Sequence, residues 1–287
     1  MYDPKSIRYP YPKRTDEHYL IVKKNDGTVF DENYPYIDKS KKFLRKQAFT
    51  RFLLNLIVFP VAHIRLGLKI KGKSILKKNK DLIKKGVISV CNHVHMWDYI
   101  AIMSAINPIK PYVVVWAPNV SGELGSMVRS VGGIPIPKQE PKATNAYLAD
   151  IKELLDNGGW LHIYPEGAMW EYYQPIRPFK TGAAYFAIKF NKPVIPFAIS
   201  YRKPSWFRRV FFKQEGVFTL SIGEPIFANN NLSFSEAKDE LTIRLHEAVC
   251  SLAGMKQEEN IYPPIFNNSE RIDYYASEYG LNYKGSK

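Results

Sequence analysis

The sequence of 287 residues has few cysteines and no obvious leader segment. Its two cysteines, Cys91 and Cys250, make neither a disulfide framework nor, by their spacing, a metal site, so we expect two reduced core residues in a cytosolic compartment. The first 14 residues are polar and rich in tyrosine and proline, and we expect no signal peptide there. No G-x-S-x-G sequence occurs, which argues against a serine hydrolase. Internal repeats and low-complexity tracts are also absent.

Acidic residues are almost missing from residues 39–85. This segment has fifteen Lys and Arg against one acid, Asp81, so it carries the whole net charge of +14. Within it lies an apolar run, residues 52–64, which Asn55, Pro60 and His63 interrupt. A membrane-spanning helix needs about 20 apolar residues, so we expect this shorter run to lie in the headgroup region of a membrane instead. Flanking cations are attracted to an anionic membrane surface.

Two other interpretations of the basic segment stay open. The run could be an ordinary core helix with a solvated basic flank. The charge could also serve nucleic acid, although no nucleic-acid motif is present and the cations accompany aliphatic rather than stacking side chains. A membrane surface is the interpretation that the pattern favours, and nucleic acid is not expected as a partner.

Strand-like and helix-like segments alternate through the rest of the chain, which is typical of one α/β domain with a mostly buried mixed sheet flanked by helices. We expect an irregular arm at 1–40, a basic apolar membrane-interfacial helix at 41–65, the main domain at 66–254 and a tail at 255–287. The expected strands are residues 66–73, 86–91, 111–117, 133–137, 160–165, 193–201 and 216–226, the last at an edge of the sheet. The expected helices are residues 97–106, 123–131, 143–158, 179–190 and 233–252, the last opened by a capping box at Ser233 and Glu236.

A polar corner follows the strand expected at 86–91. The stretch SVCNHVHMWDYI, residues 89–100, holds two histidines and an aspartate between apolar flanks. If His93 lies in the turn and Asp98 in the first turn of the next helix, the carboxylate can orient the imidazole and leave its other nitrogen free as a general base. His95 and Asp98 are a possible helical pair as well, and the spacing alone does not decide between the two histidines. An incidental histidine beside a helix cap is the plainest alternative.

Three further segments combine polar residues with turns. Glu166 and Gly167 follow the strand expected at 160–165, and Arg177 and Lys180 precede a helix, where cations and free amides together suit a phosphate. The Gly/Pro-rich stretch 132–138 ends in Lys138. Each of these also fits an ordinary turn or a solvated helix cap, so none is specific on its own.

Taken in order, these motifs resemble the glycerolipid acyltransferase family, typified by bacterial 1-acyl-glycerol-3-phosphate acyltransferase. The family's N-H-x-x-x-x-D motif matches Asn92 to Asp98, which favours His93 over His95 as the base. Its glycine-led strand ending in arginine resembles residues 133–138, with Lys138 in the place of the arginine. Its Pro-Glu-Gly-Thr-Arg turn and following Phe-Lys-x-Gly resemble residues 165–169 and 179–182, and its proline-bearing strand resembles residues 194–196. The resemblance covers about residues 66–225.

The resemblance implies transfer of a fatty acyl group from acyl-CoA or acyl carrier protein to a hydroxyl of a lysophospholipid or glycerol phosphate-type acceptor. His93 and Asp98 would be catalytic, and Lys138, Glu166, Gly167, Arg177 and Lys180 would bind substrate. We expect no cofactor or metal, and a place on the cytoplasmic face of an anionic membrane. Met169 replaces the third-motif arginine, so the acceptor's phosphate must be held differently or the acceptor differs. A transacylase, a hydrolase and a non-catalytic lipid-binding relative stay open.

Overall fold

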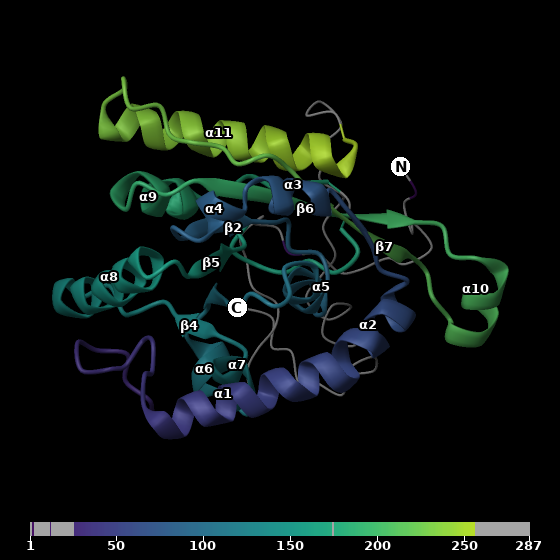
Figure 1. Cartoon of the computed structure of the whole chain (residues 1–287), viewed down its shortest axis with the longest axis horizontal. Helices are drawn as coiled ribbons and strands as arrows, with labels where there is room; N and C mark the ends of the chain where they lie inside the picture. Colours follow the sequence, from purple (N-terminus) through teal and green to yellow (C-terminus); the bar gives the residue numbers. More distant parts are fainter. Residues whose placement is uncertain (1, 3–11, 13–25, 174, 256–287) are drawn as a thin grey trace.

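One mixed sheet forms the centre of the molecule. The computed structural model describes residues 2, 12, 26–173 and 175–255, and in this part of the chain seven strands pair in the order β1-β7-β6-β2-β5-β3-β4 (Figure 1). They are β1 (Lys69–Lys71), β2 (Val87–Val90), β3 (Pro111–Val115), β4 (Gly133–Pro135), β5 (Trp160–Ile163), β6 (Val194–Arg202) and β7 (Val217–Ile222). Each lies within a segment that the sequence predicts as a strand, except that β6 extends one residue beyond the predicted 193–201, and the α/β class with a mixed sheet is confirmed.

Strand direction places the polar corners together. The pairs from β6 through β2, β5 and β3 to β4 are parallel, whereas β6 and β7 are antiparallel. The carboxyl ends of β2, β3, β4 and β5 therefore meet at one edge, where open α/β sheets bind ligands. The prediction that residues 216–226 form an edge strand is wrong, because β1 pairs with β7 and takes the edge itself.

Apolar side chains cover both faces of the sheet. On one face, alternate residues such as Ile88 and Leu161 pack under α8 (Pro141–Asp156), α9 (Gly182–Lys189) and α11 (Phe234–Ala253). On the other, Val87 and Trp160 pack against α2 (Phe59–Leu66), α4 (Lys80–Ile83) and α5 (Asp98–Ala105). Strands buried on both faces remove more apolar area from solvent than strands buried on one face, so the hydrophobic effect fixes their register strongly. The core is thus a sheet between two helical layers.

A long helix lies along one side of this core. Residues 41–66 form α1 (Lys41–Leu53), a π-helical turn at Leu54–Val58 and α2 without a break (Figure 1). The π-turn precedes Pro60, whose ring nitrogen cannot donate a helical hydrogen bond. Leu54, Phe59 and Leu66 are buried against the domain. The expected helix was residues 41–65. By length and composition alone the observed helix of 26 residues could cross a membrane, whereas the apolar run of residues 52–64 is too short by itself.

Several short helices were not predicted from the sequence. They are α3 (Lys73–Lys78), α4, α6 (Pro118–Ser121) and α10 (Trp206–Phe212). In contrast, α5, α7 (Gly125–Ser130) and α9 fall within predicted segments, and α8 and α11 overlap theirs with ends shifted by one or two residues. The capping box of α11 at Ser233 and Glu236 is present. Cys91 and Cys250 are both buried free thiols. Most of the predicted tail, and the predicted arm up to residue 25 apart from residues 2 and 12, lie outside the described residues.

The side chain of Asn92 continues the pairing of β2 with β6 beyond the last residue of β2. Its Nδ2 donates to the carbonyl of Ile199 (3.0 Å), and its Oδ1 accepts from the amide of the same residue (2.8 Å). Both partners are buried, so neither has water as a substitute. Asn92 thereby fixes the backbone immediately before His93.

Replacing Asn92 with alanine should lower the free energy of unfolding by about 2–4 kcal/mol, because two buried backbone groups of Ile199 lose their partner. Urea titration followed by circular dichroism measures the change. Asn145→Ala, at an exposed position of α8, is the matched control and should change stability by less than about 0.5 kcal/mol. Equal stability of the two variants would contradict the role of Asn92.

Candidate active site

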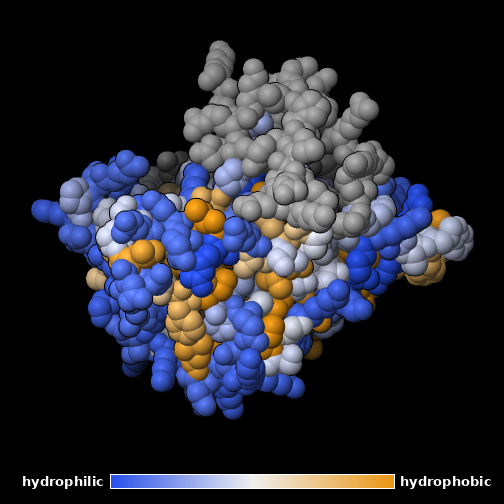
Figure 2. Space-filling model, turned by 90° about the horizontal axis from the view of Figure 1, so that it is seen from above, coloured by the Kyte–Doolittle hydropathy of each residue, from blue (hydrophilic) through white to orange (hydrophobic). Residues whose placement is uncertain are grey.

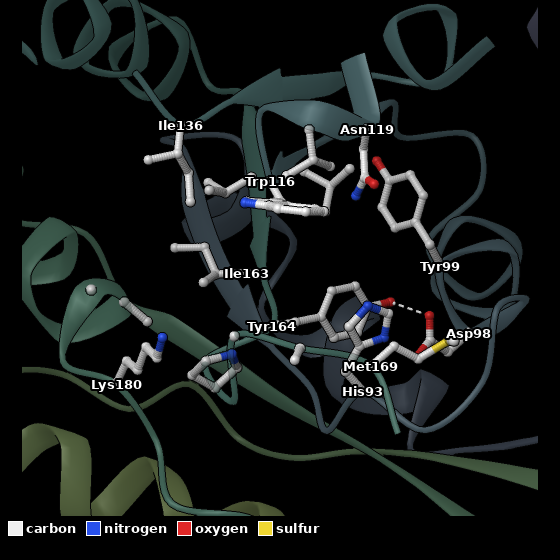
Figure 3. A pocket seen from close by; sticks show the side chains of 18 of the residues that line it. His93, Asp98, Tyr99, Trp116, Asn119, Ile136, Ile163, Tyr164, Met169 and Lys180 are labelled. Carbon is white, nitrogen blue, oxygen red and sulfur yellow. Dashed lines mark hydrogen bonds and ion pairs between the residues drawn. The ribbon is translucent and has the colours of Figure 1, made fainter. Parts of the chain in front are cut away.

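The polar corners open onto a cavity at the carboxyl edge of the parallel strands. The cavity has a volume of about 660 Å³ and is lined mainly by apolar side chains from β3, β5, α7, α8 and α9, and by Ile136 directly after β4. His93 and Asp98 lie at one end of it, and Lys180 lies at the other side of the opening (Figure 3). Val113, Val115 and Ile163 are among the residues of its apolar wall. A space of this size, apolar with a few convergent polar groups, is typical of a small-molecule or lipid site.

Three side chains form the polar end of the cavity. His93 lies in the corner after β2, and Asp98 is the first residue of α5, as the sequence predicts. Nδ1 of His93 and Oδ2 of Asp98 are 2.6 Å apart, and the Tyr164 hydroxyl donates to Oδ1 of Asp98 at 2.8 Å (Figure 3). The Tyr164 ring stacks on the imidazole, with centroids 3.9 Å apart. Asp98 thus fixes one imidazole nitrogen and Tyr164 fixes the plane of the ring.

The charge states of this group follow from burial and hydrogen bonding. Burial raises the pKa of Asp98, but attraction to His93 and hydrogen bonds from His93 and Tyr164 outweigh it and hold the pKa below its ordinary value. Burial, together with the charge of Asp98, raises the pKa of Tyr164 well above that of a free tyrosine. At neutral pH Asp98 is therefore a carboxylate and Tyr164 a neutral donor.

His95 has a different environment. Its Nδ1 accepts from the amide of Trp97 (3.1 Å) and its Nε2 lies 3.1 Å from Oε1 of Glu171. Burial lowers the pKa of His95 to about 4, so the ring is neutral near pH 7 and Nε2 donates a hydrogen bond to the carboxylate. Both ring nitrogens are engaged, and His95 is absent from the cavity wall. The predicted helical pair of His95 with Asp98 does not form.

Glu166 and Arg177 form a buried pair behind the cavity. The Arg177 guanidinium donates to the Glu166 carboxylate and to the carbonyl of Ala168. Glu166 also accepts from the amides of His93 and Arg177, each at 3.2 Å. Both side chains are 1% exposed and neither lines the cavity. The expected direct contact with an acceptor is therefore not available to either; their hydrogen bonds instead connect the turn after β5 to the corner that holds His93.

The remaining predicted residues divide between the cavity and its surroundings. Gly167 (φ +81°) and Lys180 both line the cavity, and a side chain at position 167 would meet the Lys180 aliphatic chain at 2.9 Å. Glycine is needed there because it tolerates the positive φ angle and because it leaves space for the Lys180 side chain. Lys138 is exposed and outside the wall, whereas Met169, at the place of the family's arginine, is part of it.

Sequence reasoning missed two features of the site. The sequence predicts Tyr164 only as part of a strand. Because β2 and β5 pair, this residue directly before Pro165 and Glu166 lies beside the first motif. The sequence predicts a strand at 111–117 but not that its valines line a cavity, because valines of a strand give the same pattern whether they face a helix or a cavity.

Comparison with known proteins identifies this architecture. A sequence model of the Acyltransferase family matches residues 68–200, which contain the His93 corner, the cavity strands and Lys180. Residues 68–200 therefore form a domain of the acyltransferase family. Among solved structures, the chain is similar to the 1-acyl-sn-glycerophosphate acyltransferase of Thermotoga maritima, with 16% identity over 76% of this chain and 85% of that one and a TM-score of 0.43. No curated protein sequence matches it.

Replacing Tyr164 with phenylalanine should lower kcat roughly tenfold and leave the KM for the acceptor nearly unchanged. The ring still stacks on His93, but Asp98 loses one of the bonds that hold its carboxylate in place, and a hydrogen bond to a charged group contributes about 1.5–3 kcal/mol. Steady-state kinetics of acyl transfer measures the split.

The matched control is Tyr36→Phe, which removes a buried hydroxyl donating to the carbonyl of Phe30 (2.9 Å), away from Asp98. It should lower stability without lowering kcat. A fall in kcat of equal size in both variants would show that Tyr164 acts through general stability alone.

Proposed function

We propose that this acyltransferase moves a fatty acyl group from a thioester, on acyl-CoA or acyl carrier protein, to a hydroxyl of a lysophospholipid or glycerol phosphate-type acceptor. The observation that carries the proposal is the His93–Asp98 pair at the polar end of an apolar cavity, within a domain of the acyltransferase family. The cavity suits an acyl chain, and the pair suits activation of a hydroxyl.

In the proposed reaction, Nε2 of His93 takes the proton of the acceptor hydroxyl as its oxygen attacks the thioester carbonyl carbon. The new C–O bond forms, the C–S bond breaks, and the thiolate leaves and receives the proton from the imidazolium. Asp98 stabilises the transient positive charge of His93 through Nδ1. No covalent intermediate with the protein is required. Such a base contributes roughly 10²- to 10⁴-fold to the rate.

We propose that Lys180 takes the main part in holding an acceptor's phosphate. It lies on the cavity wall beside Gly167, close to the amino end of α9, where backbone amides also attract an anion. Arg177 serves instead to position Glu166, and Lys138 is exposed and outside the cavity wall. With a lysine and no third-motif arginine, the site favours a single charged contact over a bidentate one.

The helix of residues 41–66 supports a place at a membrane surface. Leu54, Phe59 and Leu66 are buried against the domain, while Phe52 and Ile64 on other faces of the helix are 59% and 60% exposed. Because its second half, from Leu54 to Leu66, is packed on a folded domain, the helix cannot cross a bilayer without giving up these contacts. We propose that it lies in the plane of the interface, with its cations at the headgroups.

The test of the function is release of free thiol from acyl-CoA and acyl carrier protein, with lysophosphatidate, glycerol 3-phosphate and monoacylglycerol as acceptors. The wild type should release thiol only with an acceptor, and His93→Ala should reduce the rate about 10²- to 10⁴-fold. His63→Ala, at an exposed position of α2, is the matched control and should keep wild-type activity.

Each other outcome has a defined meaning. Thiol release without an acceptor would show a hydrolase. No release with any pair, from a folded protein that binds vesicles, would favour a non-catalytic lipid-binding protein. Full activity of His93→Ala would exclude His93 as the base.

Replacing Lys180 with methionine should lower kcat/KM for phosphate-bearing acceptors about 10- to 100-fold, because a charge-assisted hydrogen bond is lost. The Lys180→Met variant should acylate monoacylglycerol, which has no phosphate, at the wild-type rate. Lys189→Met, at the other end of α9, is the matched control. An equal loss on both kinds of acceptor would exclude phosphate recognition by Lys180.

A further inference from the structure

The connection between β6 and β7 carries a helix whose apolar side chains lie in solvent. α10 has the sequence WFRRVFF and no buried residue. Trp206 is 73% exposed, and Phe207, Val210, Phe211 and Phe212 are each at least 50% exposed. The helix projects from the body of the domain and forms the right-hand end of the molecule in Figure 1 and again in Figure 2, where pale and orange atoms mark it. The catalytic site does not use it.

α10 is a defined element rather than a frayed loop. The Ser205 hydroxyl caps its first turn by accepting from the amide of Arg208, and Lys213 ends it in the left-handed conformation (φ +49°). Arg208 also donates to the Gln214 side chain at 3.0 Å. The chain therefore specifies the helix by local capping while leaving its aromatic side chains outside the core.

The charges around α10 have one sign. Residues 202–213 contain five cations, Arg202, Lys203, Arg208, Arg209 and Lys213, and no acid. Aromatic side chains interleaved with Arg and Lys are typical of helices that lie at a membrane interface, where rings enter the acyl boundary and cations meet anionic headgroups.

The surface of α10 continues into that of the long helix. Nη1 of Arg208 donates to the carbonyl of Ile64, near the end of α2, at 2.6 Å. Ile64 is itself 60% exposed, and α1, the π-turn and α2 carry a further series of exposed large apolar side chains: Leu44, Phe49, Phe52, Leu56, Ile57 and Val61. These helices and α10 hold more than half of the exposed large apolar residues in the described part of the chain.

We propose that α10 is a second membrane-docking element, which inserts its aromatic side chains into the interface of an anionic lipid bilayer beside α2. The positive charge on both elements complements anionic lipid, and their continuity gives one extended docking surface. A seven-residue helix alone offers much less than the roughly 800 Å² per partner of a standard protein interface, which favours the bilayer over a protein partner. The inference does not rest on the acyltransfer reaction.

The first test is flotation of the full chain with phosphatidylcholine vesicles, with and without an equal amount of phosphatidylglycerol. The wild type should bind the anionic vesicles more tightly. The double variant Phe207→Ser, Phe211→Ser should bind them roughly tenfold more weakly or worse, because two exposed rings are lost from the interface. The matched control is Phe227→Ser, Ile243→Ser, which changes two equally exposed apolar residues outside the proposed surface and should bind as the wild type does.

The second test uses the fluorescence of Trp206. Trp160 and Trp170 are buried, and Trp97 and Trp116 are only partly exposed, so Trp206 is the most accessible tryptophan of the described residues. Vesicles that contain brominated phosphatidylcholine should quench the emission of the wild type. Trp206→Phe should remove most of the quenching while keeping vesicle binding, since phenylalanine still inserts.

Several outcomes would overturn the proposal. They are unchanged flotation of the Phe207/Phe211 variant, quenching that persists in Trp206→Phe, or a dimer in sedimentation velocity that the Phe207/Phe211 variant abolishes, which would make α10 a contact between copies. Failure of acyl transfer is separate: a protein that docks through α10 but releases no thiol contradicts only the proposed function.

Discussion

The carboxylate of Glu166 is the group on which the geometry of the site depends. It accepts from the His93 amide after β2 and from the amide and guanidinium of Arg177, so two separate segments of the chain converge on it. A buried carboxylate is costly unless all its partners are in place, so this cluster stabilises only one arrangement of the segments. The backbone of His93 is held from behind, because its amide donates to Glu166 and its carbonyl accepts from Arg177.

In this arrangement the cations at the positions of the family motifs have different surroundings. Arg177 binds Glu166, and its guanidinium also lies over the Trp170 ring, 4.5 Å from the ring centroid. Only Lys180 among the predicted cations reaches the cavity wall. A single flexible ammonium discriminates less by geometry than a planar guanidinium does.

The fold was largely predictable because the strands are short, apolar and separated by clear helical patterns. The pairing of His93 with Asp98 was predictable because it is set locally, across one turn between a strand and a helix. The interior position of β7 was not predictable, because which strand lies at the edge depends on where β1 joins the sheet. Burial of Arg177 and contact of Tyr164 with Asp98 were also missed, because both depend on pairing between distant strands.

The packing of α2 on α5 sets how far a lipid must travel. Asp98 begins α5, and α2 lies directly against that helix. If the outer face of α2 rests on a bilayer, only about one helix diameter, roughly 10 Å, separates the headgroup layer from Asp98 and its partner His93. An acceptor with its chain still in the leaflet could then present its polar end to the site. The enzyme would need to lift its substrate only partly out of the membrane.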